Sequence, residues 1–143
     1  MLSILLKFKK PIIIAVLLLT GVVIFWYYSK RKVITADVPN DNPNNEPTQI
    51  ELDQANLIAR SLYSSFDNYG IMNFWYRPMD PFEDFAAVSD KVFVLSYNRF
   101  NQLYGMSGNG TLREWFNNDA FSSNDWEYIE NTLFPRMDRL NLT

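Results

Sequence analysis

Hydrophobic residues recur at helical spacing after position 48 of the chain. Thr48 and Glu51 form the sequence pattern of a capping box, in which each side chain bonds the backbone N–H of the other residue at a helix start. The apolar residues that follow lie three or four positions apart, on one helical face: Leu52, Ala55, Ile58, Ala59, Leu62, Tyr63 and Phe66. We expect this helix to stop at Gly70.

Similar start signals predict four more helices further along the chain. Each signal is a residue that caps a helix, followed by apolar residues at helical spacing. The predicted helix starts are Asp80, Ser89 or Asp90, Thr111 and Ser122. At the first of these, Asp80 is the expected cap, Pro81 the first helical residue and Glu83 a carboxylate in the first turn.

The helix ends and the absence of strand patterns complete the predicted fold class. Gly105 is expected to end the third helix after Tyr104, and Pro135 to kink or break the last helix. The one strand-like run, residues 92–95, lies inside a better helical pattern. The sequence therefore predicts an all-α domain of five helices. Its aromatic stripes are interpreted as core, with a ligand-binding groove as the alternative.

A continuous apolar run near the N-terminus predicts a single transmembrane helix. Residues 11–28 read PIIIAVLLLTGVVIFWYY, and at ~1.5 Å per residue such a helix covers ~27 Å, close to the hydrocarbon core of a bilayer. Three cations flank each end, and an aromatic cluster stands where an interfacial belt belongs. The residues assigned to the membrane anchor are Pro11, Leu18, Gly21, Trp26, Tyr27 and Tyr28.

Two alternatives to a membrane anchor were weighed. A cleaved signal peptide is disfavoured because the exit reads FWYYSKRK and holds no small-x-small cleavage site. A buried core helix is disfavoured because the run is apolar on every side and has cations at both ends. The cations on the two sides balance, so the membrane orientation stays open.

The composition divides the chain into three parts: an N-terminal anchor at residues 1–32, a Pro/Asn-rich linker at residues 33–48 and a helical domain at residues 49–143. Within the linker, residues 36–48 read ADVPNDNPNNEPT, which offers little apolar surface to bury and predicts a semi-extended spacer. An Asn/Asp calcium loop was considered, but the residue order and the central glycine of such a loop are missing.

Charge and composition exclude several function classes. The formal net charge is −3, but six of the 13 cations and none of the 16 acids lie in residues 1–32, so the remainder carries a net charge of −9. An acidic domain is a poor partner for nucleic acid. The chain has no Cys and no His, which excludes disulfides, thiol nucleophiles, Cys/His zinc sites and imidazole chemistry.

The order of helix signals over residues 50–140 resembles an annexin repeat. The segments concerned are ANLIARSLYSSFDNYG, FNQLYG, GTLREWFNNDAFS and SNDWEYIENTL, and the resemblance is closer to single annexin-like domains of small phage-encoded proteins. It implies five helices in a compact superhelix. Annexins bind calcium through a G-x-G-T in their first loop, whereas the G-x-G-T of this chain, residues 108–111, precedes the fourth helix. Calcium binding therefore does not carry over, and no cofactor is expected.

Two groups of residues are candidates for chemistry or recognition. Glu83 and Asp84, with Asp80 beside them, could act as acid and base in a hydrolase, but carboxylates at a helix start more often serve as caps. The aromatic run Phe74, Trp75, Tyr76 with Arg77 is a candidate partner-binding loop. The structural alternative is that this loop folds back to cover the core.

The sequence predicts a single-pass membrane protein whose helical domain is a structural or protein-binding module, in a phage virion if the resemblance extends to function. The expected partners are a lipid bilayer and a protein; no catalysis and no metal are expected. The alternatives are a phage lysis factor of the holin or spanin type and a membrane-anchored hydrolase that uses Glu83 and Asp84. Oligomeric state and partner identity stay open.

Overall fold

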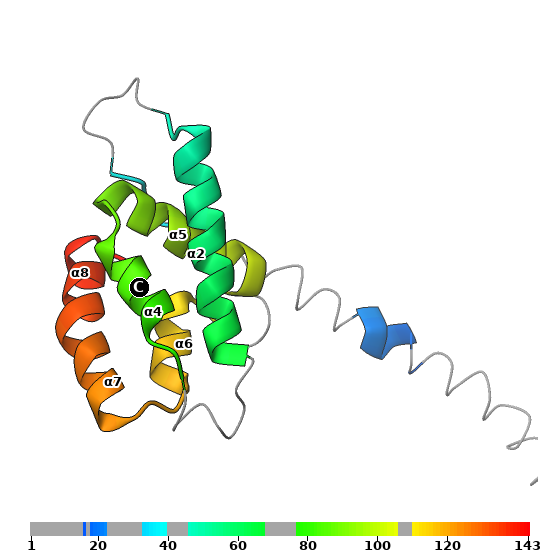
Figure 1. Cartoon of the computed structure of the whole chain (residues 1–143). Helices are drawn as coiled ribbons and strands as arrows, with labels where there is room; N and C mark the ends of the chain where they lie inside the picture. The colour runs from blue at the N-terminus through cyan, green and yellow to red at the C-terminus, as the bar shows by residue number, and fades with distance from the viewer. Residues whose placement is uncertain (1–15, 17, 23–32, 40–45, 68–76, 106–109) are drawn as a thin grey trace, which may run out of the picture. The chain divides into compact units, whose positions relative to one another are not determined.

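A computed structural model of the chain describes residue 16 and residues 18–22, 33–39, 46–67, 77–105 and 110–143 (Figure 1). The chain divides into two compact units, Met1–Lys32 and Val33–Thr143, and each is considered by itself.

The described part of the first unit is helical and apolar. Leu18, Leu19 and Val22 expose about two thirds of their surface, and the Thr20 hydroxyl donates to the carbonyl of Val16 at 2.8 Å. Among the described residues, no helix combines the length and hydropathy needed to cross a bilayer. The description reaches only residues 16 and 18–22 of the predicted span, so Pro11, Trp26, Tyr27 and Tyr28 lie outside it and the anchor stays a prediction.

The second unit is built from helices. In chain order they are α2 (Gln49–Asp67), α4 (Asp80–Ala87), α5 (Asp90–Tyr104), α6 (Leu112–Asn118), α7 (Ser123–Tyr128), the π-helix η3 (Ile129–Leu133) and α8 (Phe134–Arg139). The described residues of this unit include no strand, which confirms the all-α prediction. Figure 1 shows α2 on one side of the domain and the run α7–η3–α8 on the other, with α4 between them.

Local capping chemistry starts most of these helices where the sequence indicated. The Thr48–Glu51 box is present, since the Thr48 N–H donates to the Glu51 carboxylate at 2.7 Å and the Glu51 N–H donates to the Thr48 hydroxyl. Thr111 and Glu114 form the second box. The hydroxyls of Ser89 and Ser122 each accept a backbone N–H in the first turn of α5 and α7.

The helix α4 starts differently from the prediction. Asp80 is the first helical residue rather than a cap, and no side chain caps α4. Instead, the carbonyl of Met79 accepts the N–H groups of Phe82 and Glu83 at 2.8 and 3.0 Å. The assignment of Asp80 as the cap was therefore wrong, because the backbone itself satisfies these donors.

The last helix changes its winding before Pro135 instead of ending there. The Phe134 N–H donates to the carbonyl of Ile129, five residues back, which gives η3 its π-helical form. Pro135 then occupies the first turn of α8, directly after the π-helical turn. Residues 123–139 thus form one uninterrupted helical run that accommodates the proline through a π-turn.

Aromatic side chains from four elements meet at the centre of the core. The ring of Phe66 in α2 lies 5.4–6.0 Å, centroid to centroid, from rings of Phe82, Phe100, Trp115 and Phe116. Their mostly edge-on and tilted geometry suits the quadrupoles of the rings. The predicted stripe of α2 is buried at Ala55, Ile58, Ala59, Leu62 and Phe66, but Leu52 is 39% exposed, so its assignment to the buried face was wrong.

The segment of residues 33–38, here called the strap, lies against α5 although it was predicted to begin the linker. The carboxamide of Asn98 accepts the Ala36 N–H and donates to the Ala36 carbonyl, both at 2.7 Å. Asn101 donates to the Ile34 carbonyl at 2.9 Å and accepts the Leu112 N–H at 2.8 Å. The strap is neither helix nor strand, and it belongs to the same compact unit as the helices.

Arg136 ties α8 to the junction of α4 and α5. Its guanidinium donates to the carbonyls of Ala86 and Val88 at 2.6 Å and to the Asp90 carboxylate at 2.7 and 2.9 Å. Arg139 donates two more hydrogen bonds to the Asp90 carboxylate, at 2.7 and 3.0 Å. The hydrogen bonds from Arg139 and Arg136 together hold the pKa of Asp90 at about 2.

Replacing Asp90 with Asn should lower the free energy of unfolding near neutral pH. We expect a loss of about 1 kcal/mol, because solvent screens a carboxylate that is about one third exposed. A lowered pKa stabilises the fold above the unfolded-state pKa of ~3.9, and this contribution disappears as the pH falls towards 2. The difference between wild type and Asp90→Asn should therefore shrink over that range in urea unfolding followed by tryptophan fluorescence.

Asp84→Asn is the matched control for this measurement, because Asp84 is an exposed carboxylate on α4 with no ion pair to any described residue. It should leave the free energy of unfolding within ~0.5 kcal/mol of wild type. A wild-type minus Asp90→Asn difference that stays constant down to pH 2 would contradict the role given to Asp90.

Candidate functional site

A cleft of about 560 Å³ lies between the strap, α2 and α5, and we call it the strap cleft. The strap contributes Thr35, Ala36 and Val38 to its lining. The helices contribute the remainder: Gln49, Leu52, Ala55, Asn56, Leu95, Asn98, Arg99 and Gln102. The cleft exists because Asn98 and Asn101 hold the strap along α5 while α2 packs beside it.

Arg99 is the one charged residue in this lining. Its Nε donates to the Asn56 carboxamide oxygen at 2.5 Å, and its Nη1 donates to the Gln102 carboxamide oxygen at 3.3 Å. Both acceptors are neutral. Among the described residues, no carboxylate lies within ion-pair distance of Arg99.

This lack of a carboxylate partner is unusual within the domain. Residues 33–143 hold seven cations, and five of them form ion pairs with acids: Arg77, Lys91, Arg113, Arg136 and Arg139. Arg60 and Arg99 form none with any residue described. In a domain with 16 acids, these two arginines therefore leave a local excess of positive charge.

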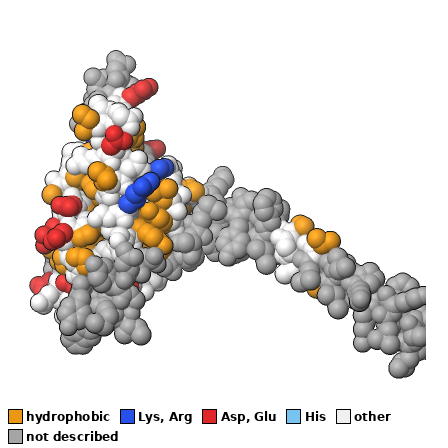
Figure 2. Space-filling model, turned by 45° about the vertical axis from the view of Figure 1, so that its right-hand side comes forward, with side chains coloured by type: hydrophobic (Ala, Val, Ile, Leu, Met, Phe, Trp, Pro, Cys, Tyr) orange, Lys and Arg blue, Asp and Glu red, His pale blue; other side chains and the backbone are white. Residues whose placement is uncertain are grey.

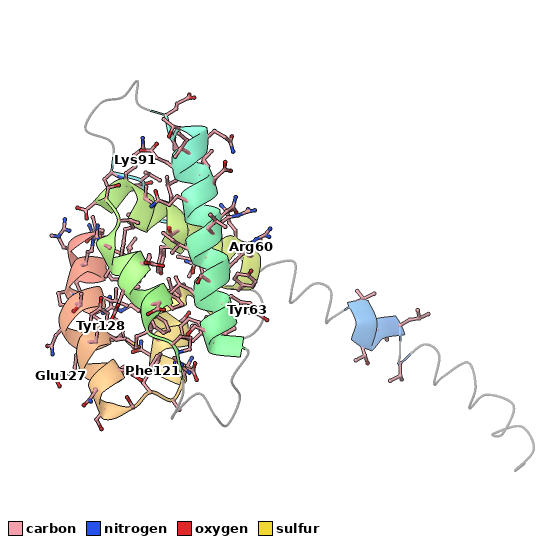
Figure 3. The ribbon with its side chains drawn as sticks, in the orientation of Figure 1. Arg60, Tyr63, Lys91, Phe121, Glu127 and Tyr128 are labelled. Carbon is pink, nitrogen blue, oxygen red and sulfur yellow. The ribbon has the colours of Figure 1, made fainter. Side chains whose placement is uncertain are left out.

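The two arginines lie on neighbouring parts of α2 and α5. Arg60 is one helical turn beyond Asn56, the residue that Arg99 contacts, and Figure 3 shows it on the same side of α2 as Tyr63. The Tyr63 ring stacks on that of Tyr104 at 3.9 Å, which joins the C-terminal ends of the two helices. In Figure 2, cationic side chains lie beside hydrophobic ones on this surface.

Exposed aliphatic side chains belong to the same pair of helices. Leu57 of α2 is 69% exposed and Leu103 of α5 is 39% exposed. Leu57 lies next to Asn56 in the chain, and Leu103 lies one turn beyond Arg99. We call the surface formed by Leu57, Arg60 and Leu103 the α2–α5 face.

The acidic cluster that the sequence suggested is exposed. Asp80, Glu83 and Asp84 all lie on the surface of α4, where water solvates their carboxylates. Burial of the Tyr128 side chain raises the pKa of its hydroxyl, and the negative charge of Glu83 raises it further. No group of three or more acidic residues in the described part of the chain is arranged to hold a metal ion.

The predicted partner-binding loop is described only at its end. Phe74, Trp75 and Tyr76 lie outside the described residues. The side chain of Arg77 is fully buried, and its Nη2 donates to the Asp119 carboxylate at 2.7 Å. Its guanidinium carbon lies 4.1 Å from the ring centroid of Phe121, so Arg77 serves in packing rather than as an exposed contact. Burial lowers the pKa of Arg77, and Asp119 opposes this shift.

Sequence reasoning missed the residues that build the strap cleft. Asn98 and Arg99 interrupt the apolar spacing of residues 90–104, and Asn101 and Gln102 do so again one turn later. This interruption was the available signal. It did not indicate which residues these side chains contact, because Ala36, the strap residue that Asn98 bonds, lies 62 positions away in the chain.

Comparisons of the chain with protein-family models, with curated proteins and with solved structures gave no match.

Replacing Asn98 with Ala should release the strap from α5. The substitution removes two hydrogen bonds to Ala36, and in hydrogen–deuterium exchange the Ala36 amide should exchange ~10–100-fold faster. Gln54→Ala, which removes an exposed amide from α2, is the control and should leave this exchange unchanged. Unchanged protection of Ala36 in Asn98→Ala would show that other contacts hold the strap.

Proposed function

We propose that this protein is a single-pass membrane protein whose acidic helical domain is a structural or protein-binding module rather than an enzyme. The apolar run of residues 11–28, with three cations on each side, carries the membrane part of the proposal. The exposed setting of Asp80, Glu83 and Asp84 supports a role without catalysis, because carboxylates solvated by water are not held in a fixed geometry. The resemblance to annexin-like phage domains supports the narrower hypothesis of a virion protein.

The strap shortens the tether that this proposal requires. If the span ends at Tyr28, five residues separate it from Ile34, whose carbonyl is bonded to Asn101. Five residues reach at most ~18 Å when fully extended. The proline- and asparagine-rich residues 39–48 come after the strap in the chain, so they do not lengthen this tether.

The α2–α5 face supports the protein-binding part of the proposal. An exposed leucine on each helix beside an arginine is the kind of surface that protein interfaces use, since their centres are enriched in apolar residues and arginine. The opposite side of the domain carries exposed acids such as Glu127 on α7, which Figure 3 shows far from Arg60.

Membrane insertion is tested by fractionating cells that express the full chain. The wild type should stay in the membrane pellet after alkaline carbonate extraction. Changing Leu18 and Leu19 together to Arg should move the chain to the supernatant, because each charge at the centre of a span costs ~2.5–3.5 kcal/mol. The matched control changes both leucines to Ile. Wild type in the supernatant would overturn the anchor.

Protein binding is tested with a photo-cross-linking amino acid at Leu57 and, as a control, at Glu127. A structural or binding module that uses the α2–α5 face should give one discrete cross-linked product from position 57 and none from position 127. Leu103→Asp should abolish that product, because a carboxylate would then stand in the apolar part of the face. Equal labelling from both positions would contradict the proposed face.

A further inference from the structure

We propose that the strap cleft is a binding site for a small organic anion, a carboxylate or phosphate monoester that carries a short apolar chain. This inference does not depend on the proposed membrane role. It rests on three properties of the cleft: an arginine without a carboxylate partner, further hydrogen-bond donors around it, and an apolar wall.

The charge of Arg99 is the first property. A guanidinium has five N–H groups, and the bonds to Asn56 and Gln102 use two of them. These bonds fix the plane of the guanidinium without neutralising it, because both acceptors are carboxamide oxygens. An orientated guanidinium with unused N–H groups is well suited to a carboxylate or phosphate, which it binds through charge-assisted hydrogen bonds.

The neighbouring polar groups favour the same ligand. The carboxamides of Asn56 and Gln102 use their oxygens to accept from Arg99, which leaves their NH₂ groups as donors. The Thr35 hydroxyl is a further donor in the lining. None of these donors bonds another described residue. No carboxylate takes part in the described lining.

The apolar wall of the cleft indicates that the rest of the ligand is a short apolar chain. Val38, Leu52 and Leu95 line the cleft beside the polar groups. Leu52 is partly exposed because this wall opens to solvent instead of closing into the core. A volume of about 560 Å³ falls within the ~300–1,000 Å³ typical of small-molecule sites. It accommodates a short chain attached to the acidic group.

Arg99 also has a structural role, because its bond to Asn56 links α5 to α2. If Arg99 had only this structural role, any side chain that bonds Asn56 could replace it. Binding of an anion in the cleft would then not depend on the charge at position 99. The ligand proposal predicts such a dependence, and the two are separated by changing the charge of the cleft while the helices stay linked.

The test is isothermal titration calorimetry of the full chain in a mild non-ionic detergent, which keeps the chain in solution whether or not residues 11–28 span a bilayer, with the detergent alone as the blank. Hexyl phosphate and hexanoate should bind, whereas hexanol, which has the same chain without the charge, should give no heat above the blank. Arg99→Gln should weaken binding of the two anions by at least ~10-fold, the scale of one lost charge-assisted interaction.

Two further variants keep the result interpretable if Arg99→Gln unfolds. Gln102→Glu places a carboxylate against Arg99 from an exposed position on α5, and it should also weaken anion binding by at least ~10-fold while leaving the domain folded. Arg60→Gln removes the same charge from an exposed residue that does not line the cleft, and it should change binding by less than ~3-fold.

Three results would overturn the proposal. The first is an absence of heat with both anions. The second is an equal loss of anion affinity in Arg60→Gln and Gln102→Glu, which would show that binding depends on the overall electrostatic potential of the domain and not on Arg99. The third is hexanol binding as tightly as hexyl phosphate, which would show that Arg99 plays no part in recognition.

Discussion

The domain depends on the need of two buried carboxamides for hydrogen-bond partners. Asn98 is 9% and Asn101 2% exposed, and an amide buried without partners would cost several kcal/mol. The helix that carries them cannot supply those partners, because its own N–H and C=O groups are already paired. The strap does so through its backbone at Ile34 and Ala36. The strap offers main-chain atoms to these carboxamides, while the side chains of Ala36 and Val38 pack against the core.

Placing the strap on α5 creates the features that bear on function. It forms one wall of a cleft whose other walls are α2 and α5, and it brings Thr35 and Val38 to the neighbourhood of Arg99. It also places the start of the compact unit at residue 33, so that the proline-rich stretch follows that start in the chain instead of preceding it. One hydrogen-bonding arrangement thus decides both the shape of the candidate site and the length of the tether to the proposed anchor.

The charges of the domain follow a consistent division of roles. The Arg136 guanidinium lies over the Phe93 ring and the Arg77 guanidinium over the Phe66 and Phe121 rings. The two arginines pair with Asp90 and Asp119 and join elements that are far apart in the chain. Removing Asp119 would leave the buried guanidinium of Arg77 without its counter-ion. Arg60 and Arg99, in contrast, have no acid to neutralise them among the described residues, although acids are the more numerous charge in the domain. The protein-binding face and the anion site proposed above both use this positive charge.

The sequence by itself determined what is local. The capping boxes at Thr48 and Thr111 and the cap at Ser89 lie within one turn of the groups they satisfy, so spacing alone located those helix starts. Helical periodicity likewise located most of the core. Where a local rule competed with tertiary packing it failed, as at Leu52, which opens towards the cleft. The tertiary structure alone decided the strap, the cleft and the burial of Arg77, because their hydrogen bonds join residues 42 to 67 positions apart and no spacing rule reaches that distance.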